Sequence, residues 1–442
     1  MKVTLQPAPN WIRVRLKALA SMQTGPFGSQ IHNEDYVSGG MPLINPSHIR
    51  DGLLSPDPDV AVGGRAVEEL KRHRLLPGDL VFARRGEMGR CALMRTSDSP
   101  CLCGTGSIRV RLHPEKAVSS FVRWALSTPH VREWLELESV GSTMDNLNTA
   151  ILGRLRISMC TLGQQRSVSN FLDRKTAAID DLIKKKERLV ELLQEKRQAL
   201  ITQAVTKGLD PAVPMKDSGV EWLGNVPAHW KLLPLRRAIS FLTDYEANGS
   251  FADTKDNVNL DKGVPYAWYV RATDLENERW GLVDSNRHCD RHSYEFLRKT
   301  KLFGGELLVA KRGEIGKVYL MPRVECPATL APNLYLVRLN TRILPEWACT
   351  WFRSEIGGAQ LVLANRSTTI GALYKDDLRD CLCLMPPAHE QQEILRCLAE
   401  QLRPIDVASI GLLSSVDLLR EYRQAVITAA VTGRLDIPAE AA

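Results

Sequence analysis

Two long segments of the chain carry apolar residues at steps of three, four and seven. Residues 164–206 contain no Pro and no Gly. Such spacing over about four heptads predicts a coiled coil, and about 40 residues make a helix of roughly 60 Å. We expect the two helices to pack on each other antiparallel; the alternative is that each packs on its own globular part. The apolar positions are Leu172, Ile179, Leu182, Leu189, Leu193 and Leu200, then Leu398, Leu402, Ile405, Leu412, Val416, Leu419 and Val426.

The second of these helices contains a proline. Pro404 removes one backbone hydrogen bond and clashes with the preceding turn, so we expect a kink or a restart there. Gly208 and Pro211 end the first helix, and residues 211–227 form a linker containing Pro and Gly.

The rest of the chain has short apolar runs between Gly and Pro residues. Residues 80–83, 108–112, 307–310 and 334–339 are rich in β-branched, aromatic and other apolar side chains, which is typical of strands. Amphipathic stretches such as 121–135 and 347–361 favour helices. The sequence therefore predicts an α+β protein in which two similar mixed α/β domains are separated by two long antiparallel coiled-coil helices.

The chain repeats itself. Residues 80–90 match residues 307–317 at an offset of 227, the difference between 307 and 80. The doublet Gln164-Gln165 matches Gln391-Gln392 at the same offset, whereas 197–210 match 423–436 at 226. This places a one-residue deletion between Gln392 and Arg423. The period is far longer than that of a solenoid repeat, so the chain imitates a twofold dimer, which suits a target with two separated half-sites.

Composition places the chain among ordinary globular proteins. It has 442 residues, 44% hydrophobic and 25% charged, with a net charge of +7 that permits a polyanionic partner. No stretch approaches 18 consecutive apolar residues, so we expect a soluble, cytoplasmic protein. The ten cysteines include two Cys-x-Cys pairs without a partner pair at metal-site spacing, so we expect reduced thiols and no metal site.

A glycine-rich block is the strongest local signal. Glycines at 78, 86 and 89 recur at 305, 313 and 316, which predicts tight turns or positive φ on either side of a strand. A phosphate-binding loop is the alternative, although no Lys-Ser/Thr follows and no long helix begins there. Basic residues at matching positions, Arg84 and Arg85 in one copy and Lys311 and Arg312 in the other, are candidate DNA phosphate contacts or solvated strand ends.

Two further sets of residues are candidates for DNA contact. Ser142 and Thr143, like Ser367 and Thr368, precede the end of each globular part, where hydroxyls either cap a helix or contact a phosphate. Lys184 and Lys185 belong to the densest basic cluster on the first long helix. Such a cluster is commonly a solvated face; the alternative is that it faces a duplex.

The sequence lacks recognisable catalytic motifs. It contains no GxSxG, HExxH, P-loop or GxGxxG after a strand, and no Asn/Asp-Pro-Pro-aromatic motif. His48, His73 and His288 have no counterpart in the other half. A duplicated enzyme should duplicate at least one acid, base or nucleophile, so we expect no enzymatic activity in this chain.

The arrangement resembles the specificity subunit of type I restriction–modification systems over nearly the whole chain. The resemblance rests on 163–165 and 390–392 at the helix starts, the helix ends 197–210 and 423–436, the repeated Gly-Asp/Glu-Leu blocks, and the linker 219–230. The family pattern usually has prolines before both Glu-Gln starts. Pro386-Pro387 fits this pattern, whereas the first copy has Met159-Cys160 and Gly163 in place of Glu.

The resemblance implies two target-recognition domains, each recognising one half of a bipartite DNA site. Residues 1–162 form the first domain and 209–388 the linker and second domain. The spacer helices span 163–208 and 389–436, and 437–442 form a tail. The helix pair would fix the gap and dock two modification subunits, with a restriction subunit joining the complex. No cofactor is expected here, since S-adenosylmethionine and ATP would belong to the partners. The residues expected at the helix pair or docking surface are Gln164, Gln165, Ile179, Leu193, Leu200, Gln391, Gln392, Leu412 and Leu419.

Two other function classes stay open. A nuclease or methyltransferase acting alone would cleave or methylate DNA without a partner. A non-catalytic scaffold would show no sequence-specific DNA binding even with its partner subunits.

Overall fold

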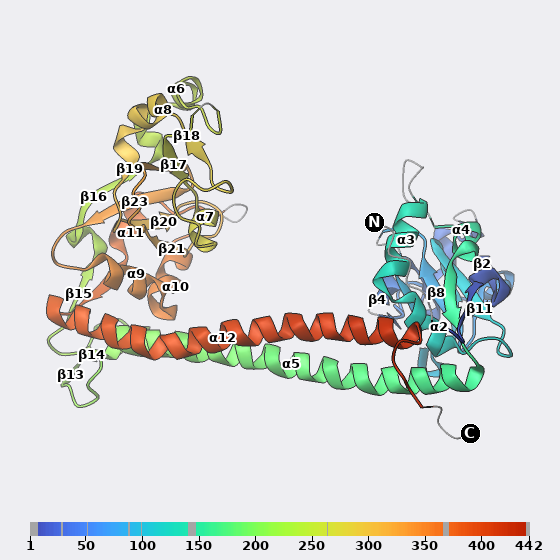
Figure 1. Ribbon diagram of the computed structural model, residues 1–442. Helices are drawn as coiled ribbons and strands as arrows, with labels where there is room; N and C mark the ends of the chain where they lie inside the picture. The colour runs from blue at the N-terminus through green and yellow to red at the C-terminus, as the bar shows by residue number, and fades with distance from the viewer. Residues whose placement is uncertain are drawn as a thin grey trace. The chain divides into compact units, whose positions relative to one another are not determined.

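The computed structural model describes residues 8–27, 30–50, 52–86, 89–98, 100–139, 147–262, 264–365 and 371–438. The chain forms two compact units, the first made of Met1–Glu187 with Leu413–Ala442 and the second of Arg188–Leu412. Each unit holds one mixed α/β globular part and a segment of each long helix, α5 (Leu162–Lys207) and α12 (Ala388–Val431) (Figure 1). The predicted α+β class with two long helices is confirmed.

The first globular part contains two four-stranded sheets. One has the order β2-β11-β8-β9 and is antiparallel; the other, β6-β3-β10-β7, includes a parallel pair of β3 and β10. β1 pairs with β12, and β4 with β5. The strands are β1 (Ile12–Arg15), β2 (Ala20–Thr24), β3 (Tyr36–Ile44), β4 (Ile49–Arg50), β5 (Leu53–Leu54), β6 (Ala61–Val62), β7 (Arg74–Leu75), β8 (Leu80–Ala83), β9 (Cys91–Leu93), β10 (Cys101–Cys103), β11 (Ser107–Leu112) and β12 (Arg156–Met159), and the helices are α1 (Gly64–Glu69), α2 (Ser119–Leu126), α3 (Pro129–Ser139) and α4 (Thr149–Arg154).

The second globular part repeats this topology. Its antiparallel sheet is β16-β23-β20-β21 and its mixed sheet is β18-β17-β22-β19, again with one parallel pair, β17 and β22. β15 pairs with β24, and the linker forms the hairpin β13-β14. The strands are β13 (Met215–Asp217), β14 (Asn225–Pro227), β15 (Lys231–Pro234), β16 (Ile239–Asp244), β17 (Ala267–Val270), β18 (His288–Cys289), β19 (Lys301–Leu302), β20 (Leu307–Ala310), β21 (Val318–Leu320), β22 (Ala328–Leu330), β23 (Leu334–Leu339) and β24 (Leu382–Met385), and the helices are α6 (Phe251–Asn257), α7 (Ala272–Glu276), α8 (Arg291–Phe296), α9 (Pro345–Arg353), α10 (Glu355–Leu363) and α11 (Lys375–Asp380).

The central strands β8 and β20 are the continuous apolar runs of the two sequence copies, and their burial explains this composition. Every side chain of Leu80–Ala83 and of Leu307–Ala310 is buried, so both faces of each strand are covered. Helices cover one face of each strand, and the mixed sheet packs against the other face. The repeated sequence therefore folds into a repeated core.

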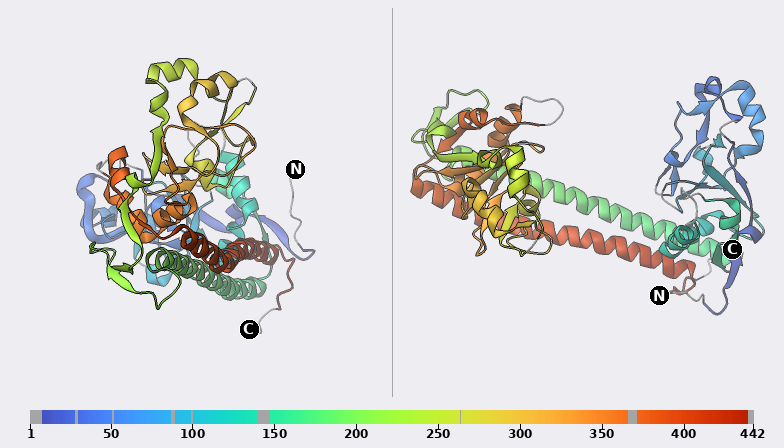
Figure 2. Two further views of the ribbon diagram at one scale, coloured as in Figure 1. Left: turned by 90° about the vertical axis from the view of Figure 1, so that its left-hand side faces the viewer. Right: turned by 90° about the horizontal axis from the view of Figure 1, so that it is seen from above.

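The end of each long helix packs on the globular part of the other half of the sequence. Ile427, Ala430 and Val431 of α12 belong to the first hydrophobic core. Ile201, Ala204 and Val205 of α5 belong to the second. Within each unit the segments of α5 and α12 also lie side by side (Figure 2). Each helix thus contacts both a partner helix and a globular part.

The row of buried apolar side chains on α5, its seam, lies one residue beyond the predicted heptad positions in the middle of the helix. Leu182 and Leu189, which the heptad pattern placed in the seam, are 42% and 45% exposed, whereas Ile183 and Val190 are buried. A helix with 3.6 residues per turn drifts relative to a 3.5-residue pattern, so the neighbouring position takes over the contact. The prediction for Leu182 and Leu189 is wrong for this reason.

α12 continues without a break through Pro404. A proline in a helix interior costs about 3 kcal/mol. Leu398 and Ile405, on either side of it, are buried, and this packing holds the helix together. A restart of the helix at Pro404 is therefore excluded, whereas a kink there stays a prediction.

The one-residue deletion between the copies lies ahead of the long helices. The amide of Leu147 donates to the carbonyl of Arg84, and the amide of Leu373 donates to that of Lys311. The two donor residues, Leu147 and Leu373, lie 226 positions apart in the sequence, whereas the two acceptor residues, Arg84 and Lys311, lie 227 positions apart. The deletion therefore lies before Leu373. The expected position between Gln392 and Arg423 is wrong. Because two glutamines stand side by side at each helix start, Gln391 can be aligned with Gln164 at an offset of 227 or with Gln165 at an offset of 226.

Candidate nucleic-acid interface

The glycine-rich blocks adopt the same backbone conformation in both copies. Gly78, Gly86 and Gly89 have φ of 93°, 82° and 81°, and the matching glycines at 305, 313 and 316 have φ of 87°, 83° and 98°. Only glycine adopts this region without strain. The prediction of positive φ on either side of the strand is confirmed.

A buried carboxylate follows the first glycine of each block and binds an arginine. Asp79 accepts two hydrogen bonds from Arg111, at 2.8 and 2.7 Å, and one from the amide of Leu76. Glu306 accepts from Arg338, at 3.4 Å, and from the amides at 303 and 304. Each pair joins the glycine turn to the central sheet. Sequence inspection missed these arginines, although Arg111 and Arg338 repeat at the offset of 227.

The four basic residues expected at phosphates occupy different surroundings. Arg84 is half-buried and donates to the carbonyl of Leu147, and Arg85 is exposed. Lys311 is only 4% exposed and lies 3.0 Å from Asp244. Arg312 is exposed, with a carboxylate oxygen of Glu246 at 3.7 Å. The structure thus brings the two pairs to equivalent strand ends and leaves Arg85 and Arg312 at the surface. Their contact with phosphates stays a prediction.

The predicted hydroxyl contacts cannot be placed. Ser142, Thr143, Ser367 and Thr368 lie outside the described residues. The helix after the first pair is capped by Asn148, whose side chain accepts from the amides of Ala150 and Ile151.

One glutamine at the start of each long helix locks the helix to its globular part. Gln165 is 1% exposed, accepts from the amide of Val118 and donates to the carbonyl of Cys160. Gln391 is fully buried, accepts from the amide of Leu344 and donates to two carbonyls, of Arg342 and Pro386. The other member of each doublet, Gln164 or Gln392, is exposed.

An ion pair between the helices occurs in both units, between residues that match at the offset of 226. In the first unit, Asp180 of α5 binds Arg423 of α12 at 2.8 Å. In the second unit, Asp406 of α12 binds Arg197 of α5 at 2.9 Å. Both residues of one pair lie 226 positions from their counterparts. The helix segments run antiparallel, since Glu187 binds Arg420 in the first unit.

The other residues expected at the helix pair lie at different depths. Ile179 is buried against Val416, and Leu419 packs beside them. Leu193, Leu200 and Leu412 are half-buried. Whether these side chains also dock a partner stays a prediction.

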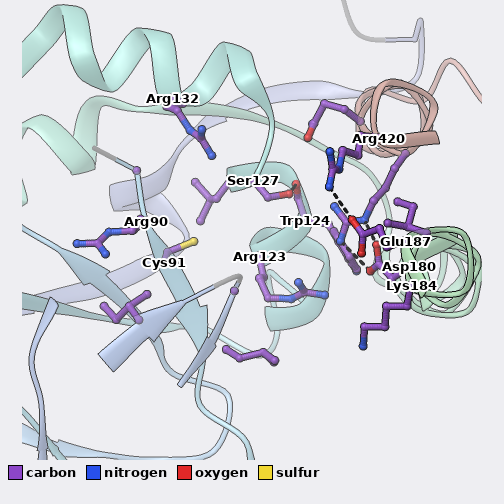
Figure 3. A pocket seen from close by; sticks show the side chains of 18 residues that line it. Arg90, Cys91, Arg123, Trp124, Ser127, Arg132, Asp180, Lys184, Glu187 and Arg420 are labelled. Atoms are coloured by element: carbon purple, nitrogen blue, oxygen red, sulfur yellow. Dashed lines mark hydrogen bonds and ion pairs between the residues drawn. The ribbon is translucent and has the colours of Figure 1, made fainter. Parts of the chain in front are cut away.

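A basic cleft lies inside the first unit, between the globular part and the helix pair (Figure 3). Its volume is about 780 Å³. Among the described residues that line it, the acidic side chains are Asp180 and Glu187, and both are bound by arginines of α12. Lys184 and Lys185 are both exposed. Lys184 lines the cleft, whereas Lys185 forms an ion pair with Asp181. The basic residues that line the cleft are Arg90, Arg123, Arg132, Lys184, Arg420 and Arg423.

Arg123 forms one wall of this cleft and is held rigidly. Its guanidinium lies 3.7 Å from the centroid of the Trp124 ring, and Asp173 accepts from both side chains. Nε of Arg90 is buried without a hydrogen-bond partner among the described residues. The cleft thus presents positive charge on preorganised side chains, which suits an anionic ligand.

One cysteine, Cys91, lines the cleft, and its side chain is buried. All ten are free thiols, and burial raises the pKa of Cys91 and Cys103 to about 12. No group of three metal-ligating side chains occurs in the part of the chain that the structure describes. No helix within the described ranges is long and apolar enough to cross a membrane.

Comparison with known proteins gives one consistent result. The chain is 25% identical over 417 residues to the specificity subunit of the type I restriction enzyme EcoKI from Escherichia coli, covering 91% of this chain and 83% of that one. It is 22% identical over 442 residues to the EcoBI specificity subunit, with coverage of 96% and 86%. The chain is a homologue of type I specificity subunits. No family model matches it.

Solved structures of type I systems share the fold. A chain from a study of complex assembly and conformational transition of the type I system superimposes with a TM-score of 0.71 at 15% identity, covering 97% of this chain and all of that one. The HsdS subunit from Thermoanaerobacter tengcongensis gives 0.54 at 15% identity, covering 98% and 100%. The duplicated α+β architecture is therefore that of the type I specificity subunits.

Proposed function

We propose that this chain is the DNA-recognition subunit of a type I restriction–modification complex. The observation that carries the proposal is the duplication. The same topology, glutamine lock and interhelix ion pair occur twice, while segments such as 245–262, which includes α6, differ from the first copy. A shared framework with differing surface segments suits two half-sites of different sequence. The similarity to named specificity subunits supports the same function.

The partners follow from this proposal. Each globular part would bind one half of an asymmetric site in double-stranded DNA, and the helix pair would dock two methyltransferase subunits. A restriction subunit would complete the complex, which would act in the cytoplasm. The recurrence of the same ion pair in both units supports two equivalent docking positions, because identical partners require repeated surfaces. Methyl transfer and cleavage would take place on the partners.

Deleting the gene should abolish one methylation motif in the host genome. We expect single-molecule methylation mapping to show one bipartite adenine-methylated motif that disappears on deletion and returns on complementation. Replacing residues 1–162 by the domain of another specificity subunit should change one half of the motif only. An unchanged pattern in a strain whose methyltransferase subunit is active would contradict the proposal and favour the scaffold alternative.

Lengthening both helices should lengthen the gap between the half-sites. Seven residues inserted after Glu187 and seven after Leu412, the ends of the compact units, keep the heptad phase and add about 10 Å. This equals about three base pairs at the 3.4 Å rise of DNA. Methylation mapping should show both half-sites unchanged and a longer gap. An unchanged gap in an active complex would contradict a role of the helices in spacing.

A further inference from the structure

Positions at which both globular parts carry a basic residue are the best guide to shared DNA contacts. Phosphates carry no sequence information, so their contacts are expected to repeat in both domains, whereas base contacts should differ. Between residues 50 and 112, seven positions carry Lys or Arg in both copies at the offset of 227. The pairs are Lys71 and Arg298, Arg72 and Lys299, Arg74 and Lys301, Arg84 and Lys311, Arg85 and Arg312, Arg90 and Lys317, and Arg111 and Arg338.

Five of the seven pairs have at least one member with a carboxylate partner in the protein. Arg111 and Arg338 bind the buried carboxylates of the glycine blocks. Lys301 binds Glu295, Lys311 binds Asp244, and Lys317 binds Glu276. Arg312 has a carboxylate oxygen at 3.7 Å. Only the pairs 71/298 and 72/299 have, in both copies, no ion pair with a carboxylate of the described residues.

These four side chains lie in the same small turn of each domain. Lys71 and Arg72 begin the 3₁₀ turn Lys71–His73, which joins α1 to β7. Arg298 and Lys299 begin the turn Arg298–Thr300, which joins α8 to β19 (Figure 1). All four are exposed, while the third residue of each turn, His73 or Thr300, is buried. The turn thus presents two adjacent cations on a buried support.

Hydrogen bonds fix this support to the central sheet. Arg111 donates to the carbonyl of Arg74 at 3.2 Å, and its counterpart Arg338 donates to that of Lys301 at 2.8 Å. In the first domain, Arg109 also donates to the carbonyl of Arg72. The duplicated half-buried arginines therefore position the turn, and their own charges are taken up by the buried carboxylates of Asp79 and Glu306. A rigid turn loses little conformational entropy when it binds a ligand.

Two of the four cations, Arg72 and Lys299, have hydrogen-bond partners among the described residues, and both partners are uncharged. Lys299 Nζ donates to the carbonyl of Ala247 at 2.7 Å, and Arg72 Nε donates to Nε2 of His73 at 3.0 Å. Burial and the neighbouring charges of Arg72 and Arg109 lower the pKa of His73, so the ring is neutral and accepts this bond. Two positive charges per domain therefore remain available to an anion.

We propose that these two turns bind the DNA phosphate backbone, one turn at each half-site. The assignment rests on the proposed DNA-recognition function and adds the element that holds each domain on the duplex. It differs from the glycine-block positions, where Lys311 is buried against a carboxylate. The turns contribute affinity and orientation, and the bases are recognised elsewhere in each domain.

The test uses the complex with its methyltransferase subunits and duplexes that carry either the mapped motif or a scrambled sequence. The variants are Lys71→Ala with Arg72→Ala, and Arg298→Ala with Lys299→Ala. The control is Arg236→Ala with Arg237→Ala, another exposed basic pair in a 3₁₀ turn, Leu235–Arg237, of the second unit. Each test variant should bind both duplexes on the order of tenfold more weakly, with a salt slope lower by about 1.8.

Charge-conserving variants and a measurement of assembly with the methyltransferase subunits separate a phosphate contact from other roles of the turns. Lys71→Arg and Lys299→Arg keep the charge and should keep affinity and slope, and the methylated motif should be unchanged in all variants. Equal affinity and slope in the test and control variants would overturn the assignment. Weakened assembly with the methyltransferase subunits and unchanged DNA binding would also overturn it, in favour of a protein contact. A parent complex that does not bind the mapped duplex would contradict the proposed function itself.

Discussion

Gln391→Met should lower the free energy of unfolding of the second unit by about 3 kcal/mol. The substitution removes a fully buried amide and leaves three backbone partners without hydrogen bonds, the amide of Leu344 and the carbonyls of Arg342 and Pro386. An unsatisfied buried polar group costs about 1–3 kcal/mol, and partial relaxation limits the sum. Hydrogen exchange in urea, followed for peptides of β24 and α9, measures the loss.

The doublet supplies its own control. Gln392 is exposed, so Gln392→Met should change the free energy of unfolding by less than about 0.5 kcal/mol. In the first unit, Gln165→Met should cost about 2 kcal/mol and Gln164→Met almost nothing, because Gln165 makes two of these bonds. Equal effects of the two members of a doublet would contradict the lock.

Asp244→Leu is expected to destabilise the second unit by about 3–5 kcal/mol. Lys311 is 4% exposed and lies 3.0 Å from the Asp244 carboxylate. The substitution therefore leaves a buried ammonium group without its main counter-charge. Glu246 remains at 3.2 Å but is largely exposed, so it compensates only in part. Lys375, on the other oxygen of Asp244, is exposed enough to regain water. Urea unfolding monitored by hydrogen exchange of β16 and β20 measures the change.

A double variant separates charge burial from loss of packing. Adding Lys311→Met to Asp244→Leu removes the stranded charge and should recover most of the lost stability. Asp256→Leu, at an exposed position of α6, is the control and should shift stability by no more than about 0.5 kcal/mol. If the double variant is as unstable as Asp244→Leu alone, burial of Lys311 is not the cause.

The same carboxylate makes the stability of this unit sensitive to acid. Burial would raise the pKa of Asp244, but hydrogen bonds from Lys375 and Lys311 outweigh it and hold the pKa below its ordinary value. A group whose pKa is lower in the folded state stabilises the fold above its unfolded pKa, near 3.9, and loses this contribution as the pH falls through its folded pKa. Unfolding of the parent should therefore become easier below about pH 4, and Asp244→Leu should show a smaller change over that range.

The duplicated architecture could be predicted because it is written in local pattern and in repetition. Apolar runs such as 80–83 and 307–310, flanked by glycines at matching positions, specify the same strand and the same positive-φ turns twice. Heptad spacing specified the long helices. These signals depend on backbone geometry and solvent exclusion alone, which act at the scale of a few residues.

The details that failed depend on which neighbour a side chain meets. A doubled glutamine fits two alignments, and only the buried hydrogen bonds of Gln165 and Gln391 decide between them. The seam moved from Leu182 to Ile183 because helical pitch and heptad period differ. Lys311 matches Arg84 in the sequence, yet Lys311 is buried because it forms an ion pair with Asp244, which is distant in the chain. Such contacts are non-local and leave no periodic trace.

The interleaving of the two units also governs the order in which the chain can fold during synthesis. Domains ordinarily fold as they emerge, the amino-terminal one first. Here the second unit, Arg188–Leu412, is continuous, whereas the first requires Leu413–Ala442. Ile427 and Val431 are among the residues that close its core. The part of the protein made first is thus completed after the second unit, and its apolar face stays open until the end of α12 has left the ribosome.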